Sequence, residues 1–267
     1  MAKLLLRGLP VGTIRGVLFD KDGTLSHSEP GLIKLAEARL DQAVCCFQGK
    51  QANAERIAKL RGMLAEAYGL SAEGVHPGGI IAVAARHHNL ISTATVFCLL
   101  GEPWPQALAL ANDVFATADE LENQDKPASP QPGTLLTGAR QLLTSLRQTE
   151  VSCAVISNDS LSGIQRFISD NKLTNAFSQL WSADDQPAKP DPEAVKALCL
   201  KLGLRPNQCA LIGDADSDLQ MARDAGIGIS LGFTAGWHRP TELTAHEHLI
   251  HHWDELTVVP EPKVHQN

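Results

Sequence analysis

Residues 16–24 read Gly-Val-Leu-Phe-Asp-Lys-Asp-Gly-Thr, a short apolar run that ends abruptly in charged residues. Two later segments have the same form: residues 151–158 read Val-Ser-Cys-Ala-Val-Ile-Ser-Asn, and residues 209–214 read Cys-Ala-Leu-Ile-Gly-Asp. Nearly apolar runs bounded by polar turns are typical of strands buried on both faces of a parallel sheet. These segments therefore predict the central strands of such a sheet, with further strands at 179–182 and 226–231.

Helical patterns separate these strand candidates. They lie at residues 135–149, 160–171, 192–202 and 217–225. Strands that alternate with helices build a parallel sheet whose faces are covered by those helices. The sequence therefore predicts an α/β fold, with a doubly wound, Rossmann-like parallel sheet as its core.

The first two predicted strands are much farther apart in the sequence than the later ones, because the first ends at residue 20 and the second begins at residue 151. A crossover between parallel strands needs only a helix and two loops, which leaves roughly 100 residues unaccounted for. These are rich in Ala, Leu and Glu and predict helices, with no strand among them. The predicted helices span 31–47, 51–68, 78–86, 90–100 and 104–122.

We therefore predict an inserted all-helical domain over residues 27–131. The α/β core domain would comprise residues 1–26 and 132–267. Residues 126–133 read Lys-Pro-Ala-Ser-Pro-Gln-Pro-Gly, a proline-rich segment that favours a hinge or linker at the point of re-entry.

Composition and charge exclude several classes of function. The 267 residues are 43% hydrophobic and 20% charged, which is typical of a globular protein. Net charge is −7, without a run of Lys and Arg, which argues against a partner that is nucleic acid or a membrane surface. No apolar run reaches the length of a membrane span, and the six cysteines form no CxxC pair. We therefore expect a cytoplasmic protein with free thiols.

Polar residues follow the predicted strands at their carboxyl ends, where ligands bind in open α/β sheets. In chain order they are Asp20, Asp22, Thr24, Ser157, Asn158, Lys189, Asp214 and Asp218. A single aspartate after a strand is commonly a turn or helix cap. Their coincidence at one edge of the sheet favours a binding site.

Four of these residues are carboxylates that would repel each other in one crevice. At an effective dielectric of 20, one pair of charges at ~4 Å costs about 4 kcal/mol. Lys189 supplies one compensating positive charge, and a divalent cation with oxygen ligands would supply the rest. A site with few carboxylates and with room for substrate phosphate and water is typical of Mg²⁺. Ca²⁺ more often binds in a cage made entirely of protein ligands.

The motifs that carry this chemistry are Asp-Lys-Asp-Gly-Thr at 20–24, Ser157, Lys189 and Gly-Asp-Ala-Asp-Ser-Asp at 213–218. In type and order they resemble the four motifs of the haloacid dehalogenase superfamily. The helical insert resembles that superfamily's C1 cap, and the core most resembles its phosphoglycolate-phosphatase-like branch. That branch usually has an acidic residue followed by Ser shortly after the first motif, and here His27 precedes Ser28.

The resemblance implies a nucleophile and an acid. Asp20 would attack phosphorus to give an aspartyl-phosphate and would also ligate the metal ion. Asp22 would protonate the leaving alkoxide, later deprotonate the attacking water, and offer its backbone carbonyl to the metal. Lys189 would tie the nucleophile to the phosphate as a catalytic and substrate-binding residue.

The resemblance also implies the remaining contacts. Ser157 and the Asn158 amide would bind a phosphoryl oxygen at a helix N-terminus. Thr24 would brace the first turn and is also expected among the substrate-binding residues. Asp214 would be a direct metal ligand. Asp218 would hold a metal-bound water.

These roles predict a Mg²⁺-dependent phosphatase that hydrolyses a small phosphorylated metabolite, such as phosphoglycolate or a sugar or triose phosphate. A sugar phosphomutase uses the same pair of aspartates and is one alternative; a catalytically silent member that binds a ligand or partner is another. Asp22 disfavours dehalogenase chemistry, because the superfamily's dehalogenases have no aspartate at that position. The protein would be a monomer or homodimer.

Two other groups of residues offer binding chemistry. Cationic and histidine side chains of the insert could contact substrate, although each is more typical of a solvated helix face: Lys34, Arg39, Arg86, His87 and His88. Residues 246–252 contain four histidines, and the i, i+4 pair His248 and His252 could bind zinc if helical. A short strand or loop with surface histidines, followed by a turn at 253–256, is the favoured interpretation. The tail after Val259 is expected to fray.

Overall fold

The computed structural model describes residues 1–48, 53–124 and 133–261. The chain divides into two compact units: a core unit, Met1–His27 with Gly133–Asn267, and an inserted unit, Ser28–Pro132. The predicted hinge at 126–133 lies outside the described residues except for Gly133. That the inserted unit acts as a cap stays a prediction.

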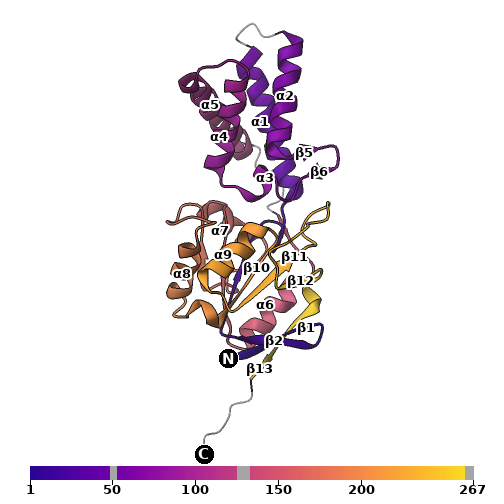
Figure 1. The fold of residues 1–267 in the computed structure, drawn as a ribbon, viewed down its shortest axis with the longest axis vertical. Coiled ribbons are helices and arrows are strands. Elements are labelled where there is room, and N and C mark those ends of the chain that lie inside the picture. The colour runs from indigo at the N-terminus through magenta and orange to yellow at the C-terminus, as the bar shows by residue number, and fades with distance from the viewer. Residues whose placement is uncertain (49–52, 125–132, 262–267) are drawn as a thin grey trace, which may run out of the picture. The chain divides into compact units, whose positions relative to one another are not determined.

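A six-stranded sheet forms the centre of the core unit, in the order β12-β11-β10-β3-β8-β9. Its strands β10, β11 and β12 are labelled in Figure 1. Every neighbouring pair is parallel. The strands are β3 (Gly16–Phe19), β8 (Ser152–Ile156), β9 (Gln179–Trp181), β10 (Cys209–Gly213), β11 (Ile229–Phe233) and β12 (His248–Ile250). This architecture confirms the predicted fold class.

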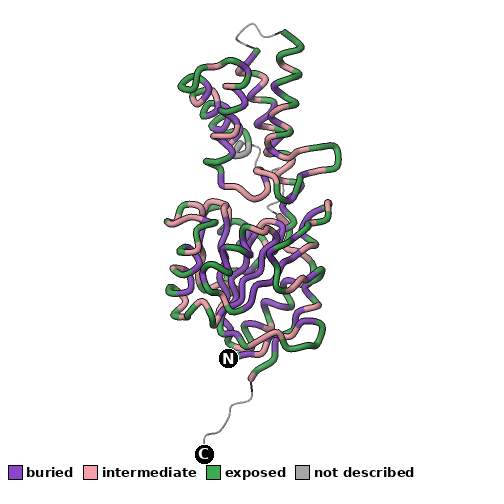
Figure 2. Tube along the Cα trace, viewed as in Figure 1, coloured by how far each residue is buried: buried purple, intermediate pink, exposed green. Residues whose placement is uncertain are grey.

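Both faces of the sheet are buried, as the near-continuous apolar runs predict (Figure 2). On β3, Val17 and Phe19 face one hydrophobic cluster and Leu18 faces another. Helices α6 (Ala139–Gln148) and α7 (Leu161–Asp170) cover the first face, and α8 (Pro192–Lys201) and α9 (Asp216–Ala225) cover the second. The alternation of side chains along each strand therefore anchors helices on both sides.

Local chemistry sets the ends of these helices. The Ser160 side chain accepts a hydrogen bond from the Gly163 N–H at the start of α7, and Asp191 accepts one from Glu193 N–H at the start of α8. Gly226, with φ of 78°, ends α9 in the left-handed conformation. For this reason the strand predicted at 226–231 begins only at Ile229.

The helix predicted at 135–149 begins only at Ala139. Gly138 precedes it with φ of 89°, and Thr134–Leu135 form β7, which pairs antiparallel with β4 (Ser26–His27). These two short strands lie where the chain leaves the core unit and re-enters it.

An antiparallel sheet in the order β13-β1-β2 was not predicted. It consists of β1 (Ala2–Leu6), β2 (Leu9–Ile14) and β13 (Leu256–Pro260). Arg7 and Gly8, both with positive φ, form the tight turn between the first two strands. Ala2 pairs with Pro260, so the expected fraying directly after Val259 is wrong at that residue. Residues 262–267 lie outside the described range.

The inserted unit contains five helices among its described residues: α1 (Glu29–Gln48), α2 (Ala54–Tyr68), α3 (Ile80–Val83), α4 (Arg86–Leu99) and α5 (Trp104–Gln124). It also contains a two-stranded ribbon, β5 (Leu70–Ser71) with β6 (Gly74–Val75), so the prediction of an all-helical insert is wrong there. Gly69, with φ of 75°, ends α2 directly before the ribbon, and Gly74, with φ of 101°, begins β6. The helix predicted at 78–86 is one turn long, because Ala84 and Ala85 are extended.

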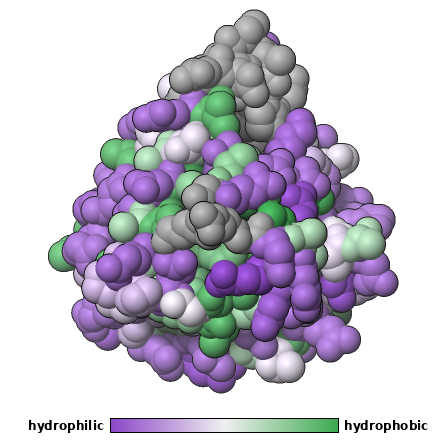
Figure 3. Space-filling view, turned by 90° about the horizontal axis from the view of Figure 1, so that it is seen from above, coloured by the Kyte–Doolittle hydropathy of each residue, from purple (hydrophilic) through white to green (hydrophobic). Residues whose placement is uncertain are grey.

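The remaining structure of the core unit includes single turns of 3-10 helix at Pro206–Gln208 and Trp253–Glu255. Across the described part of the chain, no helix has the length and apolar character needed to span a bilayer. Hydrophilic residues predominate on the face in Figure 3, where hydrophobic ones are scattered among them.

Candidate active site

Three aspartates meet at the carboxyl ends of the adjacent strands β3 and β10. Asp20 follows β3, and its backbone N–H donates to the Ile212 carbonyl of β10 at 2.9 Å. Asp214 follows β10, and Asp218 lies in the first turn of α9. One carboxylate oxygen from each lies within 4.8 Å of the others, and all three residues are buried. We call these residues the carboxylate cluster.

Lys189 enters this cluster from the loop between β9 and α8. Its Nζ lies 2.7 Å from Asp20 Oδ1 and 2.7 Å from Asp218 Oδ1, and donates to the Ile156 carbonyl at 3.4 Å. Only 5% of its side chain is exposed. The ammonium therefore joins the end of β3 to the start of α9. Its role toward a phosphate stays a prediction.

The electrostatics of the cluster show a deficit of positive charge. Burial raises the pKa of Asp20 to about 6 against the opposing effect of Lys189, and neighbouring carboxylates add to the rise. Burial, then the charges of Asp20 and Asp218, raise the pKa of Asp214 well above its ordinary value. Burial alone would lower the pKa of Lys189, but the two carboxylates outweigh it and the net shift is upward. One cation thus faces three carboxylates.

This donor set fits a hard divalent cation. The oxygens are close, buried and incompletely neutralised, which is the environment in which Mg²⁺ binds. Among the residues that the structure describes, no other three His, Cys, Asp or Glu side chains converge in this way. The histidines at 246–252 therefore form no such group; His246 and His251 have hydrogen-bond partners, the Leu243 carbonyl and Thr234.

The carboxylate of Asp214 is held at both oxygens. Thr24 Oγ1 donates to Oδ1 at 2.8 Å, and Trp237 Nε1 donates to Oδ2 at 2.5 Å. Trp237 lies in the loop after β11 and is 7% exposed. This residue was not predicted from the sequence. The available signal was an indole in a glycine-containing loop directly after a predicted strand.

Two glycines allow this loop to approach the first motif. A Cβ on Gly236 would overlap the Gly23 carbonyl, and a Cβ on Gly23 would overlap the Trp237 indole. Gly23 also has φ of 79°, a conformation that favours glycine. Gly23 is therefore needed for the turn at 22–24 and also for the close contact of this turn with the loop that contains Gly236 and Trp237.

Asp22 lies beside Lys21 and does not belong to the carboxylate cluster. Lys21 Nζ lies 2.5 Å from Asp22 Oδ1 and 3.1 Å from Asp159 Oδ2, with 8% of the lysine side chain exposed. Burial would lower the pKa of Lys21, but the two aspartates outweigh it, and the pKa rises above its ordinary value. Sequence analysis assigned no role to Lys21 or Asp159.

The second predicted motif follows β8. The Ser157 N–H donates to the Trp181 carbonyl at 2.9 Å, and its Oγ accepts the Asp159 N–H at 3.1 Å. Ser157 is 2% exposed and Asn158 is partly buried. Both precede α7, so the residues lie at a helix N-terminus, where anions bind favourably.

The five cap candidates do not form one site. Arg86 donates to Asp119 at 2.6 and 3.0 Å and lies 5.2 Å from the Phe115 ring centroid. Arg39 lies 3.9 Å from the same centroid and is 4% exposed, so a solvated face is wrong for this residue. Lys34, His87 and His88 are exposed.

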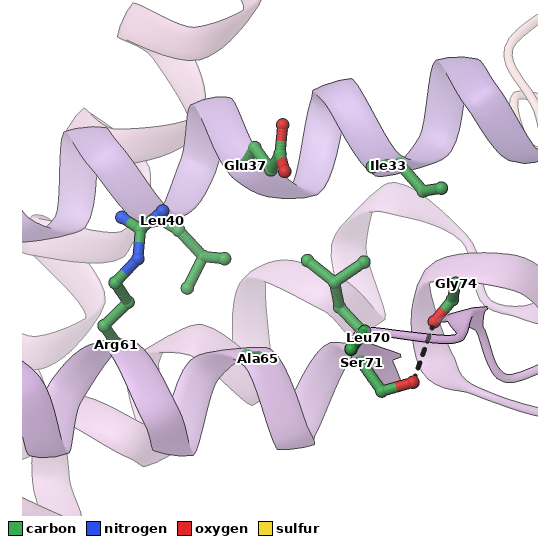
Figure 4. A pocket seen from close by; sticks show the side chains of 9 residues that line it. Ile33, Glu37, Leu40, Arg61, Ala65, Leu70, Ser71 and Gly74 are labelled. Carbon is green, nitrogen blue, oxygen red and sulfur yellow. Dashed lines mark hydrogen bonds between the residues drawn. The ribbon is translucent and has the colours of Figure 1, made fainter.

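A hollow of about 540 Å³ in the inserted unit lies between α1, α2 and the β5–β6 ribbon (Figure 4). None of the five cap candidates lines it. Its polar side chains are Glu37, Arg61 and Ser71, and the Ser71 hydroxyl donates to the Gly74 carbonyl of the ribbon.

The core unit thus combines a parallel α/β sheet with a buried lysine among aspartates at its carboxyl edge. The chain belongs to the haloacid dehalogenase-like hydrolase family, whose model matches residues 14–226. This confirms the resemblance that the four motifs indicate.

Among curated proteins, the chain is similar to phosphatases. A phosphoglycolate phosphatase of Pseudomonas putida is 30% identical over 230 residues, 84% of this chain and 73% of that protein. One of Pectobacterium atrosepticum is 26% identical over 227 residues, 84% and 83% of the two chains. The crystal structure of a predicted phosphoglycolate phosphatase from Haemophilus somnus has a TM-score of 0.61 at 18% identity, covering 92% and 97%; it shows a shared fold.

Proposed function

We propose that this protein is a Mg²⁺-dependent phosphatase that hydrolyses a small phosphorylated metabolite through an aspartyl-phosphate on Asp20. The observation that carries the proposal is the contact of Lys189 with both Asp20 and Asp218 inside the carboxylate cluster. A nucleophilic aspartate with an acid two residues later serves phosphoryl transfer, whereas ligand binding alone requires neither.

In the first step, Asp20 attacks phosphorus in line with the departing oxygen. Lys189 holds Oδ1 at 2.7 Å and so fixes the orientation of the carboxylate. Asp22 donates its proton to the leaving alkoxide. In the second step, Asp22 accepts a proton from water, the water oxygen attacks phosphorus, and phosphate leaves as Asp20 is regenerated.

The phosphoryl group would be bound between the first two motifs. Ser157 and the Asn158 amide donate to its oxygens at the head of α7, and Lys189 adds a point charge. Thr24, which donates to Asp214, supports this side of the site by fixing the first motif against the end of β10.

Asp20, Asp214, Asp218 and the backbone carbonyl of Asp22 would hold Mg²⁺, with Asp218 acting through a water. A bound Mg²⁺ neutralises charge on the phosphoryl oxygens during transfer. Thr24 and Trp237 then act as supports that orient the ligand Asp214.

The substrate class that we propose is phosphoglycolate or a sugar or triose phosphate, supported by the names of the curated relatives. The test is inorganic phosphate release from these compounds and from nucleotides, with Mg²⁺ and with a chelator. Mg²⁺-dependent release is expected from one class of small phosphates. Isomer interconversion that requires a bisphosphate activator would instead support a phosphomutase, and binding without turnover would support a silent member.

Mg²⁺ is expected to stabilise the fold more strongly at about pH 7.5 than at about pH 5. The pKa of Asp20 is about 6 in the folded protein and 3.8 when unperturbed. The contribution of Asp20 to the stability of the metal-free protein therefore falls as pH rises through that window, because the folded state must release a proton that it holds more tightly than the unfolded chain. Mg²⁺ replaces that proton. Thermal melts with Mg²⁺ or chelator measure the effect, and an equal shift at both pH values would contradict it.

Trp237→Phe is expected to lower Mg²⁺ affinity by roughly 10- to 100-fold, because it removes the hydrogen bond to Asp214 Oδ2 while keeping a ring in the buried site. Titration calorimetry with Mg²⁺ alone measures this without turnover. Trp104→Phe is the matched control, since Trp104 is 47% exposed in the inserted unit. Unchanged affinity in Trp237→Phe would show that Thr24 alone is enough to orient Asp214.

A further inference from the structure

Lys21 is a buried cation that the proposed mechanism does not use. It follows the nucleophile directly, yet its ammonium contacts Asp22 Oδ1 and Asp159 Oδ2. The same ammonium lies 5.8 Å from the centroid of Phe167, a buried ring of α7. A lysine stem that is this well covered has little freedom to choose other partners.

Asp159, the second partner, is fixed by its own loop. Its Oδ1 accepts the Ser160 N–H at 2.7 Å, its backbone N–H donates to Ser157 Oγ at 3.1 Å, and its carbonyl accepts the Ala183 N–H at 2.9 Å. The anchor for Lys21 is therefore part of the loop that carries Ser157 and Asn158. Through Lys21, the carboxylate of Asp22 is tied to this loop.

We propose that Lys21 is a positioning residue for Asp22, holding its carboxyl group at a set distance from the phosphate-binding loop at 157–159. This inference rests on the proposed function, in which Asp22 transfers the proton. An acid must come within hydrogen-bond reach of the leaving oxygen, and a side chain free to rotate spends little time there. A displacement of about 1 Å in such a group can cost on the order of 100-fold in rate.

The identity of the leaving group provides a specific readout. An alkyl phosphate releases a poor leaving group that needs a proton from Asp22 during transfer. In contrast, p-nitrophenyl phosphate releases a stable phenolate that needs almost none. Since kcat/KM includes only the steps up to formation of the aspartyl-phosphate, it reports this proton transfer and not the later attack of water.

The experiment compares kcat/KM for the best alkyl phosphate and for p-nitrophenyl phosphate in wild type, Lys21→Met, Lys21→Arg and Asp159→Asn. We expect Lys21→Met to lose roughly 10- to 100-fold on the alkyl phosphate and less than about 3-fold on the aryl phosphate. Lys21→Arg should recover most of the loss, because it keeps the charge that pairs with both carboxylates. Asp159→Asn should show a smaller loss with the same selectivity.

Lys196→Met is the matched control, since Lys196 also pairs with a carboxylate, that of Glu193 at 2.7 Å, but on the exposed side of α8. It should leave both rates unchanged. Equal losses on the two substrates in Lys21→Met would indicate a structural role and overturn the proposal. A gain on the alkyl phosphate would also overturn it, because the ion pair would then restrain Asp22 from its task.

Two further results keep the test decisive. If Lys21→Met does not fold, as judged by its thermal melt, the substrate selectivity of the loss in Asp159→Asn decides the question. If wild-type protein releases no phosphate from either compound, the proposed function has failed. Failure of the Lys21 proposal requires an active wild type.

Discussion

Asp20→Asn is expected to lower kcat/KM for phosphate release by at least about 1,000-fold, while the protein remains folded. The amide has the shape of the carboxylate but cannot attack phosphorus. It also removes one of three buried carboxylates, and because burial raises the pKa of Asp20 to about 6, the neutral side chain relieves an unfavourable charge near neutral pH. The thermal midpoint without metal should therefore be retained or raised.

The matched control for this variant is Asp216→Asn. Asp216 belongs to the same fourth motif as Asp214, but its carboxylate accepts hydrogen bonds from Thr244 and the Ala245 N–H. Its replacement should leave kcat/KM within a few-fold of wild type and lower the thermal midpoint. Phosphate release by Asp20→Asn above about one tenth of the wild-type rate would mean that another group attacks phosphorus.

Lys189→Met is expected to reduce both stability and activity. In the metal-free protein, removing the ammonium leaves buried carboxylates without their partner, and breaking a buried ion pair in this way costs about 3–5 kcal/mol. The side chain is 5% exposed, so solvent offers little compensation. The loss in kcat/KM should be about 100- to 1,000-fold, the usual effect of removing a group that stabilises transition-state charge.

Denaturant unfolding with a chelator, repeated with Mg²⁺, separates the two contributions. Mg²⁺ should restore part of the lost stability, because it also compensates the cluster, but should not restore kcat/KM. Lys196→Met, which breaks an exposed pair with Glu193, should change the free energy of unfolding by less than about 1 kcal/mol. Equal destabilisation by the two variants would contradict the assigned charge balance.

Much of the core fold could be predicted because the apolar composition of its strands indicates that they are buried on both faces of the sheet. Residues 16–19 and 209–213 are apolar throughout, and only strands covered on both faces have that requirement. The antiparallel sheet of β1, β2 and β13 escaped prediction because its long-range pairing joins Ala2 to Pro260. Nothing local to either segment indicates the other.

In the candidate site too, some residues could be predicted from the sequence and others could not. Asp20, Asp214 and Asp218 were predictable because they follow β3 and β10, adjacent parallel strands whose ends meet. Lys189 was predictable from its motif, since β8 separates its strand β9 from β3. Trp237 and Asp159 were not, since their roles depend on which side-chain atom reaches which carboxylate. The inserted unit was predictable in its helices but not in the β5–β6 ribbon, whose two strands are only two residues long each and carry no periodic pattern.

By itself the sequence determined the fold class, the family and the set of acidic and basic groups at the sheet edge, because these follow from hydrophobic periodicity and motif order along the chain. Only the tertiary structure decided which of those groups contact each other. It places Lys189 among three carboxylates, Trp237 and Thr24 on Asp214, and Lys21 between Asp22 and Asp159. Hydrogen bonds and ion pairs act over about 3 Å, and loops distant in sequence reach that range only once the sheet has formed.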